Sequence, residues 1–122
     1  MAERAIILFA HGSRDALWKR PIEAVADRLR QLRPDARVCC AYLELDTPDL
    51  AGATLEMVAA GARHVTVLPM FLGIGRHARE DLPKLVLSVR SQHPDLVMDL
   101  RNAVGEDPQV LELLARIAAQ QL

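Results

Sequence analysis

The chain has 122 residues, of which 51% are hydrophobic and 3% aromatic, and its formal net charge is −1 at pH 7. This length and composition suit one domain, residues 1–122, with an aliphatic core, and the near-neutral charge argues against a general nucleic-acid-binding protein, which normally carries a basic face. No apolar run approaches the roughly 20 residues needed to span a bilayer, and the N-terminal Met-Ala-Glu-Arg does not begin a signal peptide, so we expect a cytoplasmic location.

The first third of the chain predicts two strands with a helix between them. Residues 5–10 form an apolar run that is typical of a strand. The helix that follows ends at Arg33-Pro34, and Pro21 fits best in its first turn. Its apolar residues recur at helical spacing: Ile22, Val25, Ala26, Leu29 and Leu32. Residues 37–43 are typical of a strand that is buried on both faces.

The middle of the chain predicts a second helix, a third strand and a third helix. Thr47 as N-cap and Pro48 in the first position begin the second helix, which ends at Gly61. Residues 64–68 form the third strand. The third helix has Pro83 near its start and Pro94 beyond its end, and its apolar residues are Leu82, Leu85, Val86 and Val89.

The last quarter of the chain predicts an edge strand and a final helix. Residues 96–101 alternate between apolar and half-polar positions, which suits an edge strand better than a central one. Asp107 is the expected N-cap of the last helix, and Pro108 its first residue. The helix is expected to face the core with Val110, Leu111, Leu114 and Ile117.

The alternation of strands and helices predicts an α/β fold with a single doubly wound, four-stranded parallel sheet covered by helices on both faces. Right-handed crossovers then favour the strand order 2-1-3-4, a shortened flavodoxin-like arrangement. In such sheets the order reverses between the first and third strands, and ligands bind beyond the carboxyl ends of the strands at that point.

Two histidines follow the first and third strands at this switch point. His11 comes directly after the first strand, and His77 lies in the loop after the third. Neighbouring strands are about 4.8 Å apart, so both imidazoles are expected to reach one small metal ion. Taken alone, His11 is better explained as a turn residue, and the expectation rests on the pair. His64 and His93 belong to other parts of the fold and are interpreted as structural.

Further residues fall at the same edge of the sheet. The loop after the third strand is apolar, with Phe71 and Leu72, and Arg76 and Arg79 follow it. It suits a flat, largely apolar ligand with anionic edges, or equally a segment that packs under a helix or in a subunit contact. Glu44 ends the second strand and can assist a metal or accept a proton, although a solvated residue before a turn is the simpler interpretation.

Taken together, several segments resemble the short, single-domain sirohydrochlorin chelatases of the CbiX type, in the class II chelatase superfamily. The similar segments cover nearly the whole chain: Leu8-Phe9-Ala10-His11-Gly12-Ser13-Arg14-Asp15, Ala41-Tyr42-Leu43-Glu44-Leu45 with Pro48, Val67 to His77, Asp81-Leu82-Pro83 and Gly105-Glu106-Asp107-Pro108. Each motif is modest alone, and their order and spacing together are specific.

The resemblance implies a metal chelatase, a lyase, that inserts Co²⁺ or Fe²⁺ into sirohydrochlorin on the path to cobalamin or sirohaem, with release of two protons. The family's two histidines correspond to His11 and His77, and Glu44 is a weaker candidate metal ligand. Arg14, Arg76 and Arg79 are expected to bind the carboxylates of the macrocycle. Its face is expected to lie against Met70, Phe71, Leu72 or Ile74. The resemblance also implies a homodimer, because longer family members contain two such domains.

The donor set fits this chemistry. Two neutral imidazoles suit Fe²⁺, Co²⁺ or Ni²⁺ and leave coordination positions open for the macrocycle's nitrogens, whereas a structural zinc site normally has four ligands. No Cys cluster or His-rich tract indicates an additional cofactor, and Cys39 and Cys40 are interpreted as small buried residues. The alternatives are a non-catalytic metal or tetrapyrrole carrier and a flavodoxin-like nucleotide binder, against which the missing phosphate-binding motif argues.

Overall fold

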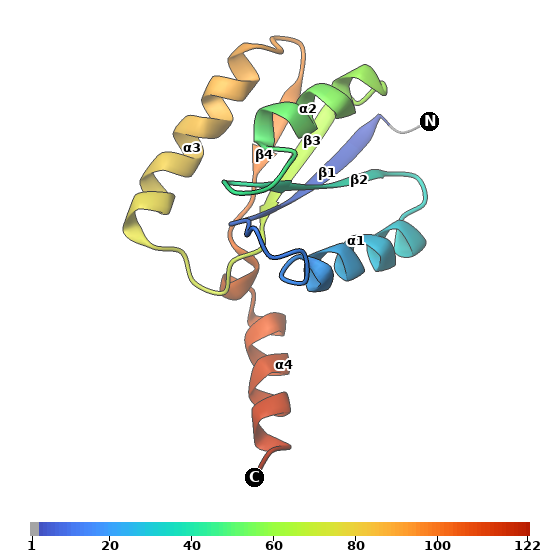
Figure 1. Ribbon diagram of the computed structural model, residues 1–122. Coiled ribbons are helices and arrows are strands. Elements are labelled where there is room, and N and C mark those ends of the chain that lie inside the picture. The colour runs from blue at the N-terminus through green and yellow to red at the C-terminus, as the bar shows by residue number, and fades with distance from the viewer. Residues whose placement is uncertain (1–2) are drawn as a thin grey trace.

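Four parallel strands form the centre of the structure, a computed structural model that describes residues 3–122 (Figure 1). The elements in chain order are β1 (Arg4–Ala10), α1 (Arg20–Leu32), β2 (Arg37–Tyr42), α2 (Leu50–Ala59), β3 (His64–Pro69), α3 (Arg76–Ser91), β4 (Val97–Leu100), the 3₁₀ turn η1 (Val104–Glu106) and α4 (Pro108–Ala119). Among the described residues, none of the helices has the length and apolar character needed to cross a membrane.

The strand order is β2-β1-β3-β4, which confirms the predicted 2-1-3-4 arrangement. β1 pairs in parallel with β2 on one side and with β3 on the other, so that Phe9 lies beside Ala41 of β2 and beside Pro69 of β3. The carboxyl ends of the first three strands therefore lie at one edge of the sheet. β4 pairs only with β3 and is a short edge strand, as its half-polar sequence predicts.

Helices cover the two faces of the sheet unequally. α2 and α3 lie over one face, where the larger core forms from every second residue of the strands, among them Ile7, Phe9, Val65 and Val67. α1 lies on the other face and packs against β1 and β2 through a smaller cluster that includes Ile22. This distribution follows from right-handed crossovers, because the step from β1 to β2 runs in the opposite direction to the two later steps.

Two helix starts differ from the sequence-based expectation. α2 begins at Leu50, and its N-cap is Asp49, whose side chain accepts a hydrogen bond from the Gly52 amide at 2.8 Å. Pro48 stays in the preceding loop because its carbonyl accepts a hydrogen bond from the Tyr42 amide at 2.9 Å. β2 correspondingly ends at Tyr42, so Glu44 lies in the loop after it.

α3 begins earlier than its prolines indicate. Its N-cap is Gly75, whose carbonyl accepts the Arg79 amide at 3.0 Å, so Pro83 lies inside the helix and His77 lies in its first turn. Pro83 is exposed and lies on the solvent side, where water can satisfy the carbonyl that a proline leaves unpaired. The expectation that His77 lies in a loop is therefore wrong.

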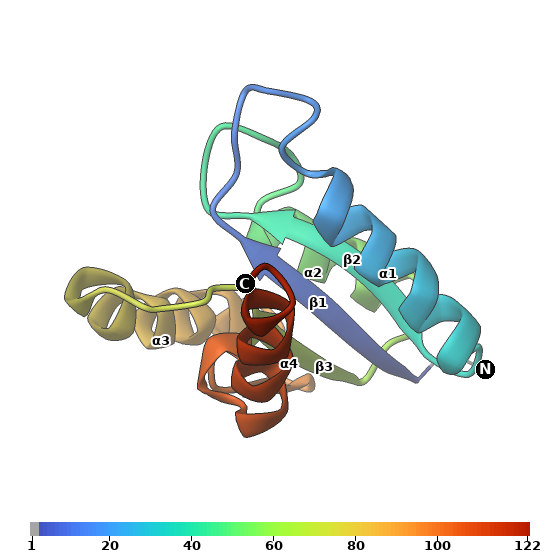
Figure 2. The same cartoon turned by 90° about the horizontal axis from the view of Figure 1, so that it is seen from below.

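The last helix is the largest departure from expectation. α4 starts at Pro108 with Asp107 as N-cap, as predicted, but it extends away from the sheet instead of packing on it (Figures 1 and 2). No residue of α4 is buried. Of the side chains expected to face the core, Val110 is half-buried, while Leu111, Leu114 and Ile117 are exposed. The physical reason is that η1 leads directly into α4 and sets its direction at the edge of the sheet.

Candidate functional site

Three loops meet at the carboxyl edge of the sheet, and each begins as a continuation of the strand ladder. The Leu43 amide donates to the Ala10 carbonyl at 2.9 Å, and the Glu44 amide donates to the His11 carbonyl at 3.0 Å. On the other side of β1, the Met70 amide donates to the Phe9 carbonyl at 2.7 Å. The loops after β2 and β3 are thereby held beside the loop that starts at His11.

Gly12 makes the close approach of His11 and Glu44 possible. Its φ is +97°, and a Cβ atom at this position would lie 1.7 Å from the Glu44 carbonyl oxygen. Only glycine adopts this conformation readily and leaves this space free. The backbone of Glu44 therefore lies directly beside His11, and the structure brings these two predicted site residues together.

The His11 ring is positioned by an aromatic contact. Its centroid lies 4.6 Å from that of Phe71, with the ring planes 40° apart. Phe71 in turn makes an edge contact with Phe9 at 6.3 Å and is 6% exposed. Phe71, which was expected to contact a ligand, is thus mainly a buried support for the exposed His11, while the adjacent Leu72 is 64% exposed.

The loop that carries Phe71 and Leu72 rests on η1. The Gly105 amide donates to the Phe71 carbonyl at 3.0 Å, and a Cβ atom on Gly105 would lie 1.5 Å from the Leu72 carbonyl oxygen. Gly105 was not a candidate residue, although its place in Gly105-Glu106-Asp107-Pro108 marks a turn at this edge. Any side chain at this position would push the loop, and with it the support of His11, away from the sheet.

The first turn of α3 supplies two cationic groups, the exposed guanidinium groups of Arg76 and Arg79, and His77 is exposed between them. The amino end of a helix carries partial positive charge, so this turn favours anionic groups of a ligand. The Arg76 guanidinium contacts the Glu80 carboxylate at 3.3 Å. This exposed ion pair within the helix contributes little to stability, so a carboxylate of a ligand can take the place of Glu80 at the guanidinium.

A closed metal cage is not present in the described part of the chain. Residues 3–122 contain no group of three or more His, Cys, Asp or Glu side chains arranged to hold a metal ion. Glu44 is therefore not assembled with both histidines into a three-ligand set. The common placement of His11 and His77 on one ion stays a prediction.

Exposed apolar side chains surround the site, and most of them were missed by sequence reasoning. They come from all three loops and comprise Leu17, Trp18, Leu43, Leu45 and Leu72. Leu45 has a φ of +63°, which an L residue adopts only at a cost, and which holds its backbone in a left-handed turn. Leucines inside turn-forming loops such as Leu43-Glu44-Leu45 are the signal that could have identified this apolar rim.

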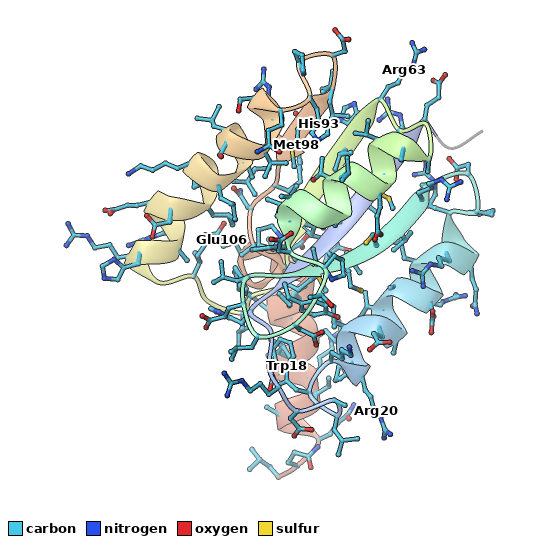
Figure 3. The ribbon with its side chains drawn as sticks, turned by 45° about the horizontal axis from the view of Figure 1, so that its top comes forward. Trp18, Arg20, Arg63, His93, Met98 and Glu106 are labelled. Atoms are coloured by element: carbon cyan, nitrogen blue, oxygen red, sulfur yellow. The ribbon has the colours of Figure 1, made fainter. Side chains whose placement is uncertain are left out.

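The loop after β1 is shaped by its own polar side chains. The Asp15 carboxylate accepts the Leu17 amide at 2.9 Å, and the Asp15 amide donates to the Ser13 hydroxyl at 3.0 Å. Trp18 makes an edge contact with Tyr42 at 6.4 Å and remains partly exposed (Figure 3). Arg14 is exposed in the same loop and is free to meet an anionic ligand.

The remaining histidines lie outside this site, as expected. His64 is the first residue of β3, at the amino end of the strand, and its Nε2 lies 2.6 Å from a carboxylate oxygen of Asp99 on β4. His93 follows α3 and lies with Arg63 at the end of the molecule opposite Trp18 (Figure 3).

The two cysteines are half-buried and face opposite sides of β2, in agreement with a structural role. Burial raises the pKa of the Cys39 thiol to about 11 from 9.0 and raises the pKa of Cys40 as well. The protonated thiol is thus favoured in the folded state. Each protonated thiol therefore contributes to the stability of the folded protein. This contribution is complete at a pH below the thiol's pKa in the unfolded chain, and it is lost as the pH rises through the thiol's pKa in the folded protein.

Cys39 is therefore expected to react slowly with iodoacetamide in the folded protein. The raised pKa lowers the thiolate fraction about 100-fold, and the greater nucleophilicity of a more basic thiolate recovers about tenfold, so alkylation at about pH 8 should be roughly tenfold slower than in concentrated urea. Mass spectrometry of time points in both conditions measures this ratio. Equal rates would show that the thiol is not buried.

Comparisons with known proteins agree with this architecture. The CbiX family model matches residues 5–121. The chain is 28% identical over 82 residues to the sirohydrochlorin cobaltochelatase of Methanopyrus kandleri, an alignment that covers 67% of this chain and 57% of that one. The chain thus spans a little over half the length of that relative.

Two solved structures have the same fold. A CbiX protein from Marinobacter aquaeolei superposes with a TM-score of 0.85 at 29% identity, over 97% of this chain and 96% of that chain. The sirohydrochlorin chelatase SirB from Bacillus subtilis subspecies spizizenii, solved in complex with cobalt, superposes with a TM-score of 0.80 at 25% identity. That match covers 98% of this chain and 51% of the SirB chain.

Proposed function

Because the chain belongs to the CbiX family, we propose that it is a sirohydrochlorin chelatase, which inserts Co²⁺ or Fe²⁺ into the macrocycle. The observation that carries the proposal is the family match over residues 5–121, with His11 and the first turn of α3 at the sheet edge where this fold places ligands. The comparison structure of SirB, solved with cobalt, supports the choice of metal class.

The reaction exchanges one divalent ion for two protons. Two pyrrole N–H bonds break, four metal–nitrogen bonds form, and two protons leave the macrocycle. The protein has to hold the ion without saturating it, since the macrocycle supplies four nitrogens. His11 and His77 as neutral imidazoles are suited to this, because they bind Co²⁺, Fe²⁺ or Ni²⁺ and leave other positions open.

The surroundings of His11 fit a delivery role. The ring packs on Phe71 at 4.6 Å while the residue stays exposed, so its orientation is restricted and it remains accessible to a ligand. The backbone amide of Glu44 donates a hydrogen bond to the His11 carbonyl. The Glu44 carboxylate is therefore near His11 and is available as a further ligand or as an acceptor for a released proton.

The rim fits a flat macrocycle with carboxylates at its edge. Leu43, Leu45 and Leu72 offer apolar surface to the ring, and burial of the roughly half of each side chain that is exposed contributes on the order of 1 kcal/mol each. Arg14, Arg76 and Arg79 offer guanidinium groups that bind carboxylates with two hydrogen bonds each. The mixture of apolar and cationic surface is the observation that favours a tetrapyrrole over a nucleotide.

Two copies of the chain are proposed to act together. The match to SirB covers 98% of this chain and 51% of the SirB chain, so two copies would have the size of that protein. A cytoplasmic location, and a place in cobalamin or sirohaem biosynthesis, are further parts of the proposal.

Repeated turnover tests the proposal. We expect each chain to metallate many equivalents of sirohydrochlorin, with the visible absorption change followed for Co²⁺, Fe²⁺ and Ni²⁺ in parallel. A protein that binds sirohydrochlorin but never exceeds the spontaneous rate of metallation would instead be a carrier, and the chelatase proposal would fail.

A further inference from the structure

The loop after β2 (residues 43–49) has no buried residue, although it carries part of the candidate site. Leu43, Glu44 and Leu45 are all exposed, and Leu45 has a left-handed φ of +63°. The loop after β1 (residues 11–19) has no buried residue either. Segments with few buried apolar contacts open easily, so polar contacts are needed to hold these two loops in place.

Within residues 3–122, one ion pair joins these two loops, which lie side by side beyond the ends of β1 and β2 (Figure 2). The Lys19 ammonium nitrogen lies 3.3 Å from a carboxylate oxygen of Asp46, and the two side chains are only 31% and 16% exposed. Four other ion pairs join residues at most four positions apart, and in each of them both side chains are at least 50% exposed. Water and salt screen a partly buried pair less than an exposed one, so the contact between the loops is the stronger kind.

Both partners of this ion pair are themselves held in place. Lys19 is the N-cap of α1, its carbonyl accepts the Glu23 amide at 3.0 Å, and its ammonium group lies 6.0 Å from the ring centroid of the buried Tyr42. The Asp46 carboxylate accepts the Thr47 amide at 2.8 Å, which fixes its orientation. The ion pair therefore ties the middle of the loop after β2 to a helix that is packed on the sheet.

We propose that Lys19 and Asp46 are positioning residues of the candidate site, and that their ion pair keeps the loop after β2 closed against the loop that begins at His11. The Glu44 amide, which donates to the His11 carbonyl at 3.0 Å, fixes the base of the loop, and the ion pair fixes its middle. The loop then presents its exposed leucines and the Glu44 carboxylate in one arrangement. A site that is ordered in advance binds its ligand more tightly, because less entropy is lost on binding.

Two substitutions remove the ion pair and little else. The Lys19 side chain makes no cap hydrogen bond at the start of α1, so Lys19→Met leaves the helix start intact. Asp46→Asn keeps an oxygen that accepts the Thr47 amide. In both variants the closed loop is populated less, and the dissociation constant of metal-free sirohydrochlorin should rise about threefold. Lys19→Arg keeps the cation and should bind as the wild-type protein does.

The inference rests on the proposed function for the identity of the ligand, but its test does not depend on metal insertion. Absorbance titration of sirohydrochlorin without metal gives the dissociation constant and needs no turnover. Hydrogen exchange measured by NMR then shows whether the loop itself has changed. The Leu43 and Glu44 amides, which bond across to the loop after β1, should exchange about threefold faster in both variants. The Met70 amide, which bonds to Phe9 on the other side of β1, should keep its rate.

Asp35→Asn is the matched control, because it breaks a closer but exposed ion pair, at 2.7 Å, with Arg33 at the C-cap of α1. It should change neither the dissociation constant nor the exchange rates. A threefold change in this control as well would overturn the proposal, because the effect would then not be specific to the loop.

The proposal is also overturned if Lys19→Met and Asp46→Asn bind sirohydrochlorin as tightly as the wild-type protein, or if Lys19→Arg is as defective as Lys19→Met. Unchanged exchange of the Glu44 amide in the first two variants would overturn it by itself. A wild-type protein that does not bind sirohydrochlorin would contradict the proposed function, and the exchange rates would then decide the role of the ion pair alone.

Discussion

Alanine in place of His11 or His77 is expected to lower the rate of metal insertion into sirohydrochlorin about 100-fold or more, with the fold retained. Each substitution leaves one imidazole where two are proposed to hold the incoming ion, so the ion is neither concentrated nor oriented at the macrocycle. Insertion rates under limiting metal, where ion binding controls the rate, measure the effect directly.

The two variants are expected to differ in their loss of folding stability, and this difference separates a chemical effect on insertion from a structural one. His77 is exposed in the first turn of α3, so His77→Ala should change stability by less than about 0.5 kcal/mol. His11→Ala also removes the ring contact with Phe71 and should cost about 0.5–1.5 kcal/mol. Thermal unfolding of both variants gives these values.

His93→Ala is the matched control, because this histidine lies at the opposite end of the molecule. It should leave the insertion rate unchanged. If the His11 and His77 variants both kept normal rates under limiting metal, the assignment of the ion to these two side chains would be wrong.

Gly12→Ala is expected to destabilise the protein by about 3 kcal/mol or more and to abolish insertion. The left-handed φ of +97° costs an L residue about 1–2 kcal/mol, and the new Cβ atom would lie 1.7 Å from the Glu44 carbonyl oxygen. The loop after β2 would have to move away from His11. Urea unfolding gives the loss of stability from the shift in midpoint at constant slope.

Gly61→Ala provides a control with the same backbone strain and no collision. Gly61 has a φ of +100°, and nothing lies within 4 Å of a Cβ atom built there. Its substitution should cost only about 1–2 kcal/mol and leave insertion intact. Equal losses of stability in the two variants would show that the approach of Glu44 to His11 is not a tight contact.

The fold was predictable where local pattern and chain topology decide it. The first three strands followed from apolar runs, the edge position of β4 from its half-polar alternation, and the strand order from right-handed crossovers. α4 was different. Its periodicity correctly shows an apolar surface at Leu111, Leu114 and Ile117, but periodicity cannot say which surface covers it, and the turn at Gly105 directs the helix away from its own sheet.

The sequence predicts where in the fold the candidate site lies, but it does not predict how the side chains of the site are arranged. The strand order places His11 and the start of α3 at one edge. The closeness of Glu44 to His11 depends on the left-handed conformation of Gly12, and the support of the His11 ring depends on a contact with Phe71. Both arise from tertiary packing between loops that are far apart in the sequence, which a single sequence does not specify.

The initial rate of metal insertion into sirohydrochlorin, at protein concentrations far below that of the tetrapyrrole, tests the proposed chelatase function most directly. We expect a rate with Co²⁺ or Fe²⁺ that rises in proportion to protein concentration and exceeds the spontaneous rate, and that falls toward the spontaneous rate in the His11→Ala protein. A rate equal to the spontaneous one with Co²⁺, Fe²⁺ and Ni²⁺ alike, at every protein concentration, would contradict it.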